Sequence, residues 1–364
     1  MFLRCTLASL LLITSGTALL AAEGGQSRLQ EVASFPDQQV TGIAVSKEGR
    51  IFVNFPYWSG DHKLSVAEVL KDGTIHPYPD EFWNRNEGNP RERFVCVQSV
   101  YVDPEDALWV LDPAAPMLDK VVENGPKLVK IDLASNKVVQ TILFDKTVAP
   151  EKSYLNDIRI DQKSGHAFIT ESGVGSIVIV DLKSGQARRV LQDSPTTKAE
   201  PDKSLVVDGM KLIDPKTGTA PQFNADGIAL DQDKGILYFH PLSARKLYKV
   251  KTSDLLNEKL SGEELASRVV TVGETAAPDG MILGKDGMVY LAAFEEDAIV
   301  RVDPGTGKSQ TVIRDERLQW PDTMSWGPSG ELYVTTSQIH RMPKFHAGQS
   351  ARKEPYRVYM LSVP

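Results

Sequence analysis

Residues 226–239 read DGIALDQDKGILYF, and apolar and polar side chains alternate on both sides of the turn sequence DQDKG. Alternation with a period of two predicts two β-strands, and the short Asp-, Lys- and Gly-rich connection predicts that they form a hairpin. Repeats of such a unit indicate blades or layers that stack or close into a ring. The pattern occurs six times, as TGIAVSKEGRIFVN from Thr41, QSVYVDPEDALWVL from Gln98, NDIRIDQKSGHAFIT from Asn156, the run from Asp226, DGMILGKDGMVYLA from Asp279 and DTMSWGPSGELYVT from Asp322.

A second hairpin of similar character follows most copies, for example in residues 127–144 (KLVKIDLASNKVVQTILF) and 175–191 (GSIVIVDLKSGQARRVL). Two hairpins make a four-stranded sheet, and four-stranded sheets repeated about an axis make a β-propeller. The sequence therefore predicts an all-β fold, a six-bladed β-propeller, with residues 23–364 as a single domain.

The two ends of the chain predict how the ring closes. The sixth copy is followed by only one further strand, Tyr356–Leu361, whereas residues 28–35 (RLQEVASF) precede the first copy without a partner. We expect this N-terminal strand to join the last blade, since an open ring would leave long strand edges exposed. Residues 193–223, rich in Pro, Lys, Asp and Thr, are expected to form an insertion on one face, with a small hairpin at 206–212 (VVDGMKL).

Composition and the N-terminal residues indicate an exported globular protein. The net charge is −7 without a basic block, which excludes nucleic acid as an expected partner. Residues 1–22, with Arg4 and an apolar run from Leu7 to Leu20, predict a secretory signal cleaved after Ala22, and hence a periplasmic or extracellular location. The alternative is a membrane anchor, but the run is short for a span of about 20 residues. The sequence predicts no oligomeric state.

The number of cysteines agrees with the prediction of an exported, periplasmic protein. Once the signal is removed, Cys96 is the single remaining cysteine, so no internal disulfide can form. Cys96 lies in the apolar run FVCV, and we expect it to fill the core.

The first residue of each copy is polar and carries a side-chain oxygen. The first strand of each propeller blade lines the central channel, so we expect these residues to form a ring around it. Three like charges facing one cavity repel unless a cation neutralises them, and carboxylate and amide oxygens suit calcium. We therefore predict a divalent cation held by Asn156, Asp226 and Asp279. The alternative is turn chemistry, because Asp and Asn before a strand also bond to backbone amides. The ring comprises Thr41, Gln98, Asn156, Asp226, Asp279 and Asp322.

Aromatic residues lie two to four positions upstream of four ring members, namely Phe94, Tyr154, Phe223 and Trp320. Together with Thr41 and Gln98 they predict a pocket for a small aromatic or amphipathic ligand. The alternative is that these rings pack between blades. The six histidines are scattered, and no HExxH, GxSxG, P-loop or dinucleotide-binding motif is present, which disfavours nucleotide and serine-hydrolase chemistry.

Three segments resemble the major royal jelly protein and yellow family: residues 54–84, residues 154–161 (YLNDIRID) and residues 226–255 (DGIALDQDKGILYFHPLSARKLYKVKTSDL). The resemblance covers nearly the whole mature chain. It implies a secreted six-bladed propeller, in a family whose members bind small amphipathic ligands in the central channel or act in pigment formation, including dopachrome tautomerisation. The chain lacks the disulfide cysteines of insect members and so looks like a bacterial relative.

Residues 277–308 (APDGMILGKDGMVYLAAFEEDAIVRVDPGTGK) are also similar to one blade of the senescence-marker-protein and gluconolactonase family. That family holds a divalent cation and hydrolyses sugar lactones. The resemblance implies that Asp279 is a metal ligand and base, that Asn156 is a channel residue and that Asp226 replaces an asparagine ligand. Thr41 takes the place of a glutamate ligand, which weakens the lactonase reading.

Two classes of function follow. The favoured hypothesis is a binding protein that captures a small aromatic or amphipathic molecule, with any cation in a structural part. The alternative is an enzyme, either a metal-dependent lactonase or a dopachrome-type tautomerase, with Asp279 or Asp322 as catalytic base.

Overall fold

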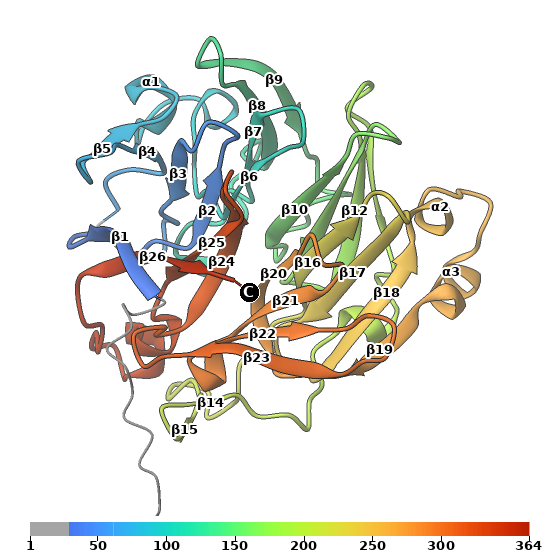
Figure 1. Cartoon of the computed structure of the whole chain (residues 1–364). Helices are drawn as coiled ribbons and strands as arrows, with labels where there is room; N and C mark the ends of the chain where they lie inside the picture. Colours follow the sequence, from blue (N-terminus) through green and yellow to red (C-terminus); the bar gives the residue numbers. More distant parts are fainter. Residues whose placement is uncertain (1–28, 61, 364) are drawn as a thin grey trace, which may run out of the picture.

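In the computed structural model, which describes residues 29–60 and 62–363, six four-stranded antiparallel sheets surround a central axis (Figure 1). The predicted signal segment, residues 1–22, lies outside the described residues. From the axis outward, blade 1 is β2 (Gly42–Val45), β3 (Ile51–Asn54), β4 (Val66–Val69) and β5 (Ile75–Pro77); blade 2 is β6 (Ser99–Val102), β7 (Ala107–Asp112), β8 (Lys127–Asp132) and β9 (Lys137–Leu143); blade 3 is β10 (Leu155–Asp161), β11 (His166–Glu171), β12 (Ser176–Asp181) and β13 (Ala187–Val190).

The second half of the chain repeats this order. Blade 4 is β16 (Ala225–Asp231), β17 (Ile236–Pro241), β18 (Lys246–Lys251) and β19 (Val270–Glu274); blade 5 is β20 (Pro278–Leu283), β21 (Val289–Ala293), β22 (Ala298–Val302) and β23 (Ser309–Arg314); blade 6 is β24 (Pro321–Trp326), β25 (Glu331–Thr336), β26 (Tyr356–Ser362) and β1 (Leu29–Phe35). The all-β, six-bladed prediction is confirmed.

The N-terminal strand completes the last blade, as the sequence predicts. β1 pairs antiparallel with β26, from Leu29 opposite Leu361 to Phe35 opposite Tyr356. Because the first strand of the chain supplies the outer strand of the sixth sheet, the two ends of the propeller are joined by a ladder of backbone hydrogen bonds.

The hydrophobic core lies between neighbouring blades. Every residue of β7, β10 and β12 except Asp181 is buried, because both faces of these sheets contact other blades. The outermost strands β9 and β23 instead carry many exposed side chains, so burial falls from the axis to the rim. The repeated alternation of the sequence therefore serves packing between blades.

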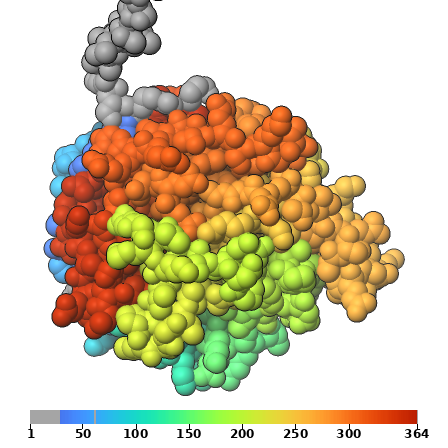
Figure 2. Space-filling model, turned by 90° about the horizontal axis from the view of Figure 1, so that it is seen from below, coloured from blue at the N-terminus to red at the C-terminus, as the bar shows by residue number. Residues whose placement is uncertain are grey.

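The 193–223 segment contributes a separate two-stranded hairpin, β14 (Val206–Val207) and β15 (Met210–Lys211). In Figure 2 this segment, in yellow-green, lies across the face seen from below. Short helices occupy other connections, and none in the described ranges is long and apolar enough to cross a membrane. They are α1 (Glu81–Asn84), α2 (Thr252–Leu255), α3 (Gly262–Arg268) and the 3₁₀ turns η1 (Pro90–Glu92), η2 (Pro116–Leu118), η3 (Pro195–Thr197), η4 (Phe294–Glu296), η5 (Ile339–Arg341) and η6 (Pro343–Phe345).

Candidate functional site

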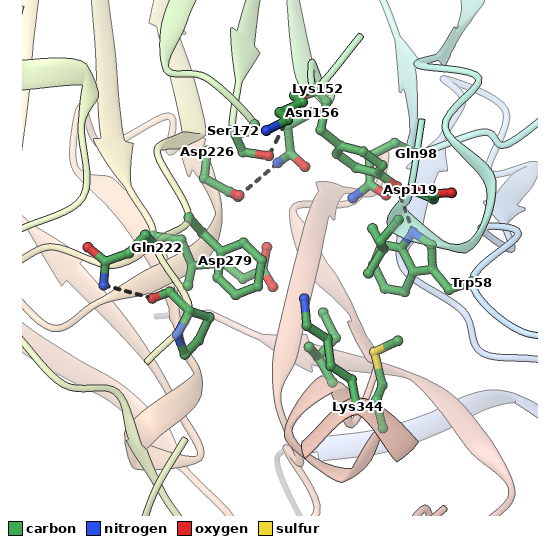
Figure 3. A pocket seen from close by; sticks show the side chains of 18 of the residues that line it. Trp58, Gln98, Asp119, Lys152, Asn156, Ser172, Gln222, Asp226, Asp279 and Lys344 are labelled. Atoms are coloured by element: carbon green, nitrogen blue, oxygen red, sulfur yellow. Dashed lines mark hydrogen bonds between the residues drawn. The ribbon is translucent and has the colours of Figure 1, made fainter. Parts of the chain in front are cut away.

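A pocket of about 260 Å³ lies at the mouth of the central channel (Figure 3). Its buried end is polar, its walls are aromatic and aliphatic, and its exposed end carries charges. The buried polar residues are Gln98, Asn156, Asp226 and Asp279; the aromatic residues are Trp58, Tyr154, Phe223, Trp320 and Phe345; the exposed charged residues are Asp119, Lys152 and Lys344.

β-bulges set the direction of the polar residues in blades 3 to 6. The pairing register shifts at Asn156 in β10, at Asp226 in β16, at Asp279 in β20 and at Asp322 in β24. The inner strands of blades 1 and 2 pair with their neighbours without such a shift. A bulge adds one residue to a strand and turns its side chain out of the pleat, and bulges are common beside binding sites.

Hydrogen bonds join these side chains across blades. Asn156 Nδ2 donates to Asp226 Oδ1 at 2.8 Å, and Trp320 Nε1 donates to Asp279 Oδ2 at 2.6 Å. Asp279 of the next blade lies close enough to Asp226 for its charge to raise the pKa of the Asp226 carboxyl group. Four adjacent blades therefore share one polar network at the buried end of the pocket.

A second network lines the wall formed by blades 1, 2 and 3. The indole N–H of Trp58 donates to the Tyr154 hydroxyl at 2.7 Å, and that hydroxyl donates to Gln98 Oε1 at 2.8 Å. Each aromatic ring thus presents an apolar face while its polar atom is satisfied inside the wall.

The environment favours the protonated form of the buried carboxyl groups. Burial, followed by the charges of Asp279, Asp157 and Asp322, raises the pKa of Asp226 well above its usual value. Burial also raises the pKa of Asp279 to about 7, although the Trp320 hydrogen bond acts in the opposite direction. Near neutral pH the Asp226–Asp279 pair therefore retains a proton, so it offers both a hydrogen-bond donor and an acceptor.

Three of the sequence-predicted residues lie outside this pocket. Thr41 is fully buried, and its Oγ1 accepts a hydrogen bond from Asn54 at 3.0 Å. Phe94 packs against Trp83 with ring centroids 5.2 Å apart. Asp322 is buried and does not line the pocket. The structure brings the others together around one cavity: Gln98, Tyr154, Asn156, Phe223, Asp226, Asp279 and Trp320.

Asp322 differs from its neighbours in the ring. Its Oδ1 accepts from Thr323 Oγ1 at 3.2 Å, whereas its Oδ2 is buried without a hydrogen-bond partner among the described residues. Burial, then the charges of Asp279 and Asp157, raises the pKa of this carboxyl group well above its usual value. A protonated Asp322 is therefore the form that this environment favours.

Sequence reasoning missed Trp58, Lys152 and Lys344. They lie in connections between strands. These connections are not part of the repeated hairpin, so comparing the six copies does not point to them. The aromatic character of WSGDH after β3 was the one available signal for Trp58, and the two lysines gave none.

The residues offer calcium an incomplete site. Asn156, Asp226 and Asp279 supply two carboxyl groups and one amide, which are suitable oxygen donors. However, Asn156 directs its NH₂ group to Asp226, and Thr41 of blade 1 is already bonded to Asn54. Within the described ranges, no group of three or more His, Cys, Asp or Glu side chains is arranged to hold a metal. Calcium takes six to eight oxygens, so water would have to complete the shell. The cation remains a prediction.

Comparison with known proteins gives a family match and distant relatives. Residues 95–363 match the model of the major royal jelly protein family. Major royal jelly protein 5 of Apis mellifera is 22% identical over 273 residues, covering 69% of this chain and 42% of that protein. A dopaminechrome tautomerase of Drosophila melanogaster is 22% identical over 306 residues, covering 76% of this chain and 64% of that protein. The chain thus spans less than two thirds of the length of these relatives.

Solved structures with the same fold include a gluconolactonase from Xanthomonas campestris and the calcium-binding protein regucalcin from Agrobacterium tumefaciens. The first has a TM-score of 0.55 at 12% identity, covering 92% of this chain and 89% of its own. The second has a TM-score of 0.54 at 14% identity, covering 92% and 93%. At these identities the likeness shows a shared fold alone.

Proposed function

Since the chain belongs to the major royal jelly protein family, we propose that it binds a small aromatic molecule in the channel pocket. The observation that carries this proposal is the combination of a buried carboxyl pair, Asp226 and Asp279, with the aromatic walls of one cavity. A flat ring fits between aromatic side chains, while its hydroxyl or amino group can bond to the carboxyl pair.

The charged end of the pocket narrows the ligand class. Lys152 and Lys344 line the pocket from different blades, and Figure 3 shows the Lys344 ammonium group directed into the cavity. An anionic substituent on the ligand would therefore find two ammonium groups at the exposed end, offset by the single carboxylate of Asp119. We propose an aromatic ligand with a hydrogen-bond donor at one end and an anionic group at the other.

Isothermal titration with indole and catechol derivatives tests binding. Wild-type protein should bind at least one aromatic probe, and Asp279→Leu should weaken that binding by tenfold or more because the ring would lose its polar anchor. Asp286→Asn, which changes a carboxylate in the β20–β21 turn away from the pocket, should bind as wild type. Absence of binding across the series, or equal binding by Asp279→Leu, would count against the proposal.

A second candidate is proton-transfer catalysis of the tautomerase type. It is favoured by two buried carboxyl groups that line one cavity and interact electrostatically, because one can donate a proton while the other accepts one. In such a reaction the carboxylate would remove a proton from a carbon of the substrate, and the partner carboxyl would return one to an oxygen. Dopaminechrome decay measured in EDTA tests it: catalysis lost in both Asp226→Asn and Asp279→Asn supports this candidate, whereas no catalysis rejects it.

Metal-dependent lactone hydrolysis is the alternative from the sequence, and the incomplete donor set gives it less support. Gluconolactone turnover that requires calcium and Asp279 would establish it. We also propose that the protein is exported, on the strength of the apolar N-terminal sequence; fractionation of expressing cells tests that location.

A further inference from the structure

The β14–β15 hairpin of the 193–223 insertion contacts blade 6 through its turn. Asp208 and Gly209 form that turn with φ angles of 53° and 74°, the left-handed conformation that a two-residue Asp-Gly hairpin requires. Asp208 Oδ2 accepts a hydrogen bond from the Arg341 guanidinium group at 2.9 Å and lies 3.2 Å from His340 Nε2. The turn therefore meets the segment that connects β25 to β26.

His340 connects Arg341 to the wall of the pocket. Arg341 Nε donates to His340 Nε2 at 2.9 Å, and the His340 ring stacks on Trp320 with centroids 5.8 Å apart and planes 9° from parallel. Phe294 stacks on Trp320 as well, at 4.1 Å and 18°. Burial lowers the pKa of His340 to about 4, so its ring is neutral and Nε2 can accept the bond from Arg341.

Trp320 needs this support because its backbone is strained. Its φ angle of 56° lies in the left-handed region, which is uncommon for a bulky residue. The two stacked rings and the hydrogen bond from Nε1 to Asp279 Oδ2 hold the side chain in place. Without one of these contacts, the indole would be freer to leave the orientation in which it meets Asp279.

Apolar packing connects the same segments. Leu205, Val207 and Leu212 of the insertion belong to one buried cluster with Trp320 and with Ile339 and Met342 of the β25–β26 connection. Ile339, Met342, Lys344 and Phe345 of that connection line the pocket. Residues 205–212 of the insertion therefore lie behind the pocket wall and contact it through both the apolar cluster and Asp208, while Phe223 at the end of the insertion lines the pocket.

We propose that Asp208 is a positioning residue for the pocket. By accepting from Arg341, whose Nε donates to His340 Nε2, it fixes the stack on Trp320, and through Trp320 it fixes the carboxyl group of Asp279 and the 339–345 segment. Asp208 itself does not line the cavity, so it acts only through these neighbours. Its effect on ligand affinity rests on the proposed function, whereas its effect on Trp320 does not.

¹⁹F NMR of protein containing 5-fluorotryptophan tests the effect on Trp320 without any ligand. The chain has five tryptophans, and Trp320→Phe identifies the Trp320 resonance. Asp208→Asn keeps the size of the side chain and tolerates the left-handed turn while removing the charge. We expect it to shift or broaden the Trp320 resonance, whereas the resonances of Trp83, Trp109 and Trp326 stay in place.

Asp202→Asn is the matched control, because Asp202 lies in the same insertion and forms an ion pair with the adjacent Lys203 at 3.4 Å. It should leave all five resonances unchanged. An unchanged Trp320 resonance in Asp208→Asn overturns the proposal, and so does an equal shift in the control. A general shift of every resonance in Asp208→Asn would also overturn it, since that would indicate a change in the whole fold.

Binding of indole-2-carboxylate gives the second readout. Asp208→Asn should weaken binding about threefold to tenfold, and Asp208→Asn combined with Arg341→Gln should be no weaker than Arg341→Gln alone, because both changes break one contact. If the affinity losses of Asp208→Asn and Arg341→Gln add up in the double variant, the two residues do not act through one contact and the proposal is overturned. If wild-type protein binds no aromatic probe while the Trp320 resonance still shifts, the proposed function fails and the positioning role stands.

Discussion

Trp320 donates its indole N–H to Oδ2 of Asp279 across 2.6 Å, and this bond joins blade 6 to blade 5 inside the channel. The donor lies on a residue with a left-handed backbone, and the acceptor lies in a β-bulge. Two local departures from regular strand geometry therefore meet at one hydrogen bond, as is common where a fold forms a binding site.

Trp320→Phe should remove this bond while leaving an aromatic ring in the wall. We expect the variant to bind an aromatic probe at least tenfold more weakly than the wild-type protein. We also expect its free energy of unfolding to fall by about 2 kcal/mol at pH 8, where Asp279 carries its charge. Trp326→Phe is the control, since it removes an indole bond to the Leu283 carbonyl at 2.8 Å outside the pocket. Equal loss of binding in both variants would argue against a specific role for the Trp320 contact.

The buried carboxyl groups make stability depend on pH. The pKa of Asp279 is raised to about 7 in the folded protein, chiefly by burial, and that of Asp226 is raised well above its usual value. A raised folded-state pKa means that the folded state binds the proton more tightly than the unfolded chain. The stabilisation is therefore complete below about pH 4 and is lost as pH rises through about 7.

We expect the free energy of unfolding, measured with urea in EDTA, to fall between pH 5 and pH 8 by up to about 1.4 kcal/mol per pH unit for each such group. Asp279→Asn should reduce this slope because the amide does not titrate. Asp193→Asn, outside the channel, should retain the wild-type slope. A wild-type stability that rises over this range would contradict the predicted shift.

A buried ion pair supports the loops of blade 2. Lys127 Nζ lies 2.7 Å from Asp112 Oδ2, and both side chains are fully buried. Asp112 also accepts bonds from the backbone N–H groups of Val95, Cys96 and Ala114. Asp112→Ala should lower the free energy of unfolding by about 3–5 kcal/mol, because it leaves a buried ammonium group unpaired.

Pairing Asp112→Leu with Lys127→Met should recover part of that loss, since no charge then remains buried. Asp233→Asn provides the exposed control: Asp233 pairs with Lys163 at 2.7 Å on the surface, and its removal should leave the urea midpoint unchanged. A small effect of Asp112→Ala would mean that water reaches Lys127.

The blades could be predicted from the sequence because strand alternation and turn chemistry are local and recur six times. The ring residues, from Thr41 to Asp322, could likewise be identified as the first residue of each copy. The direction of their side chains could not. Register shifts occur beside Asn156, Asp226, Asp279 and Asp322, of which the first three line the cavity. Gln98 and Thr41 precede regular strands, yet Gln98 lines the cavity while Thr41 bonds to Asn54. A one-residue change of register decides which side a residue faces, and the sequence carries no clear mark of it.

The aromatic residues show a similar limit. Tyr154, Phe223 and Trp320 line the pocket, while Phe94, at a comparable distance before its strand, packs on Trp83. Hydrophobicity alone does not distinguish a pocket wall from the core. Lys344 and Trp58 come from irregular connections whose paths depend on tertiary contacts, such as the one between Asp208 and Arg341.

Calcium should bind weakly through Asn156, Asp226 and Asp279. We expect millimolar calcium to raise the melting temperature of the wild-type protein at pH 7.5, because the ion replaces the proton of the carboxyl pair. Asp279→Asn should abolish the shift, and magnesium should produce less of it, since it demands a stricter octahedral shell. No calcium-dependent shift, together with no calcium by metal analysis, would exclude the predicted cation.

The last prediction concerns the anionic end of the ligand. Lys344 extends into the pocket from η6, and no carboxylate of the described residues forms an ion pair with it. Indole-2-carboxylate should therefore bind about tenfold more tightly than its methyl ester in titration calorimetry, and Lys344→Gln should remove the difference by weakening the acid alone. Lys285→Gln changes a lysine in the β20–β21 turn, at the far end of the strand from Asp279. It should preserve the difference in affinity between the acid and the ester. An ester that binds as tightly as the acid to wild-type protein would show that the ligand needs no anionic group, while leaving aromatic binding by the pocket intact.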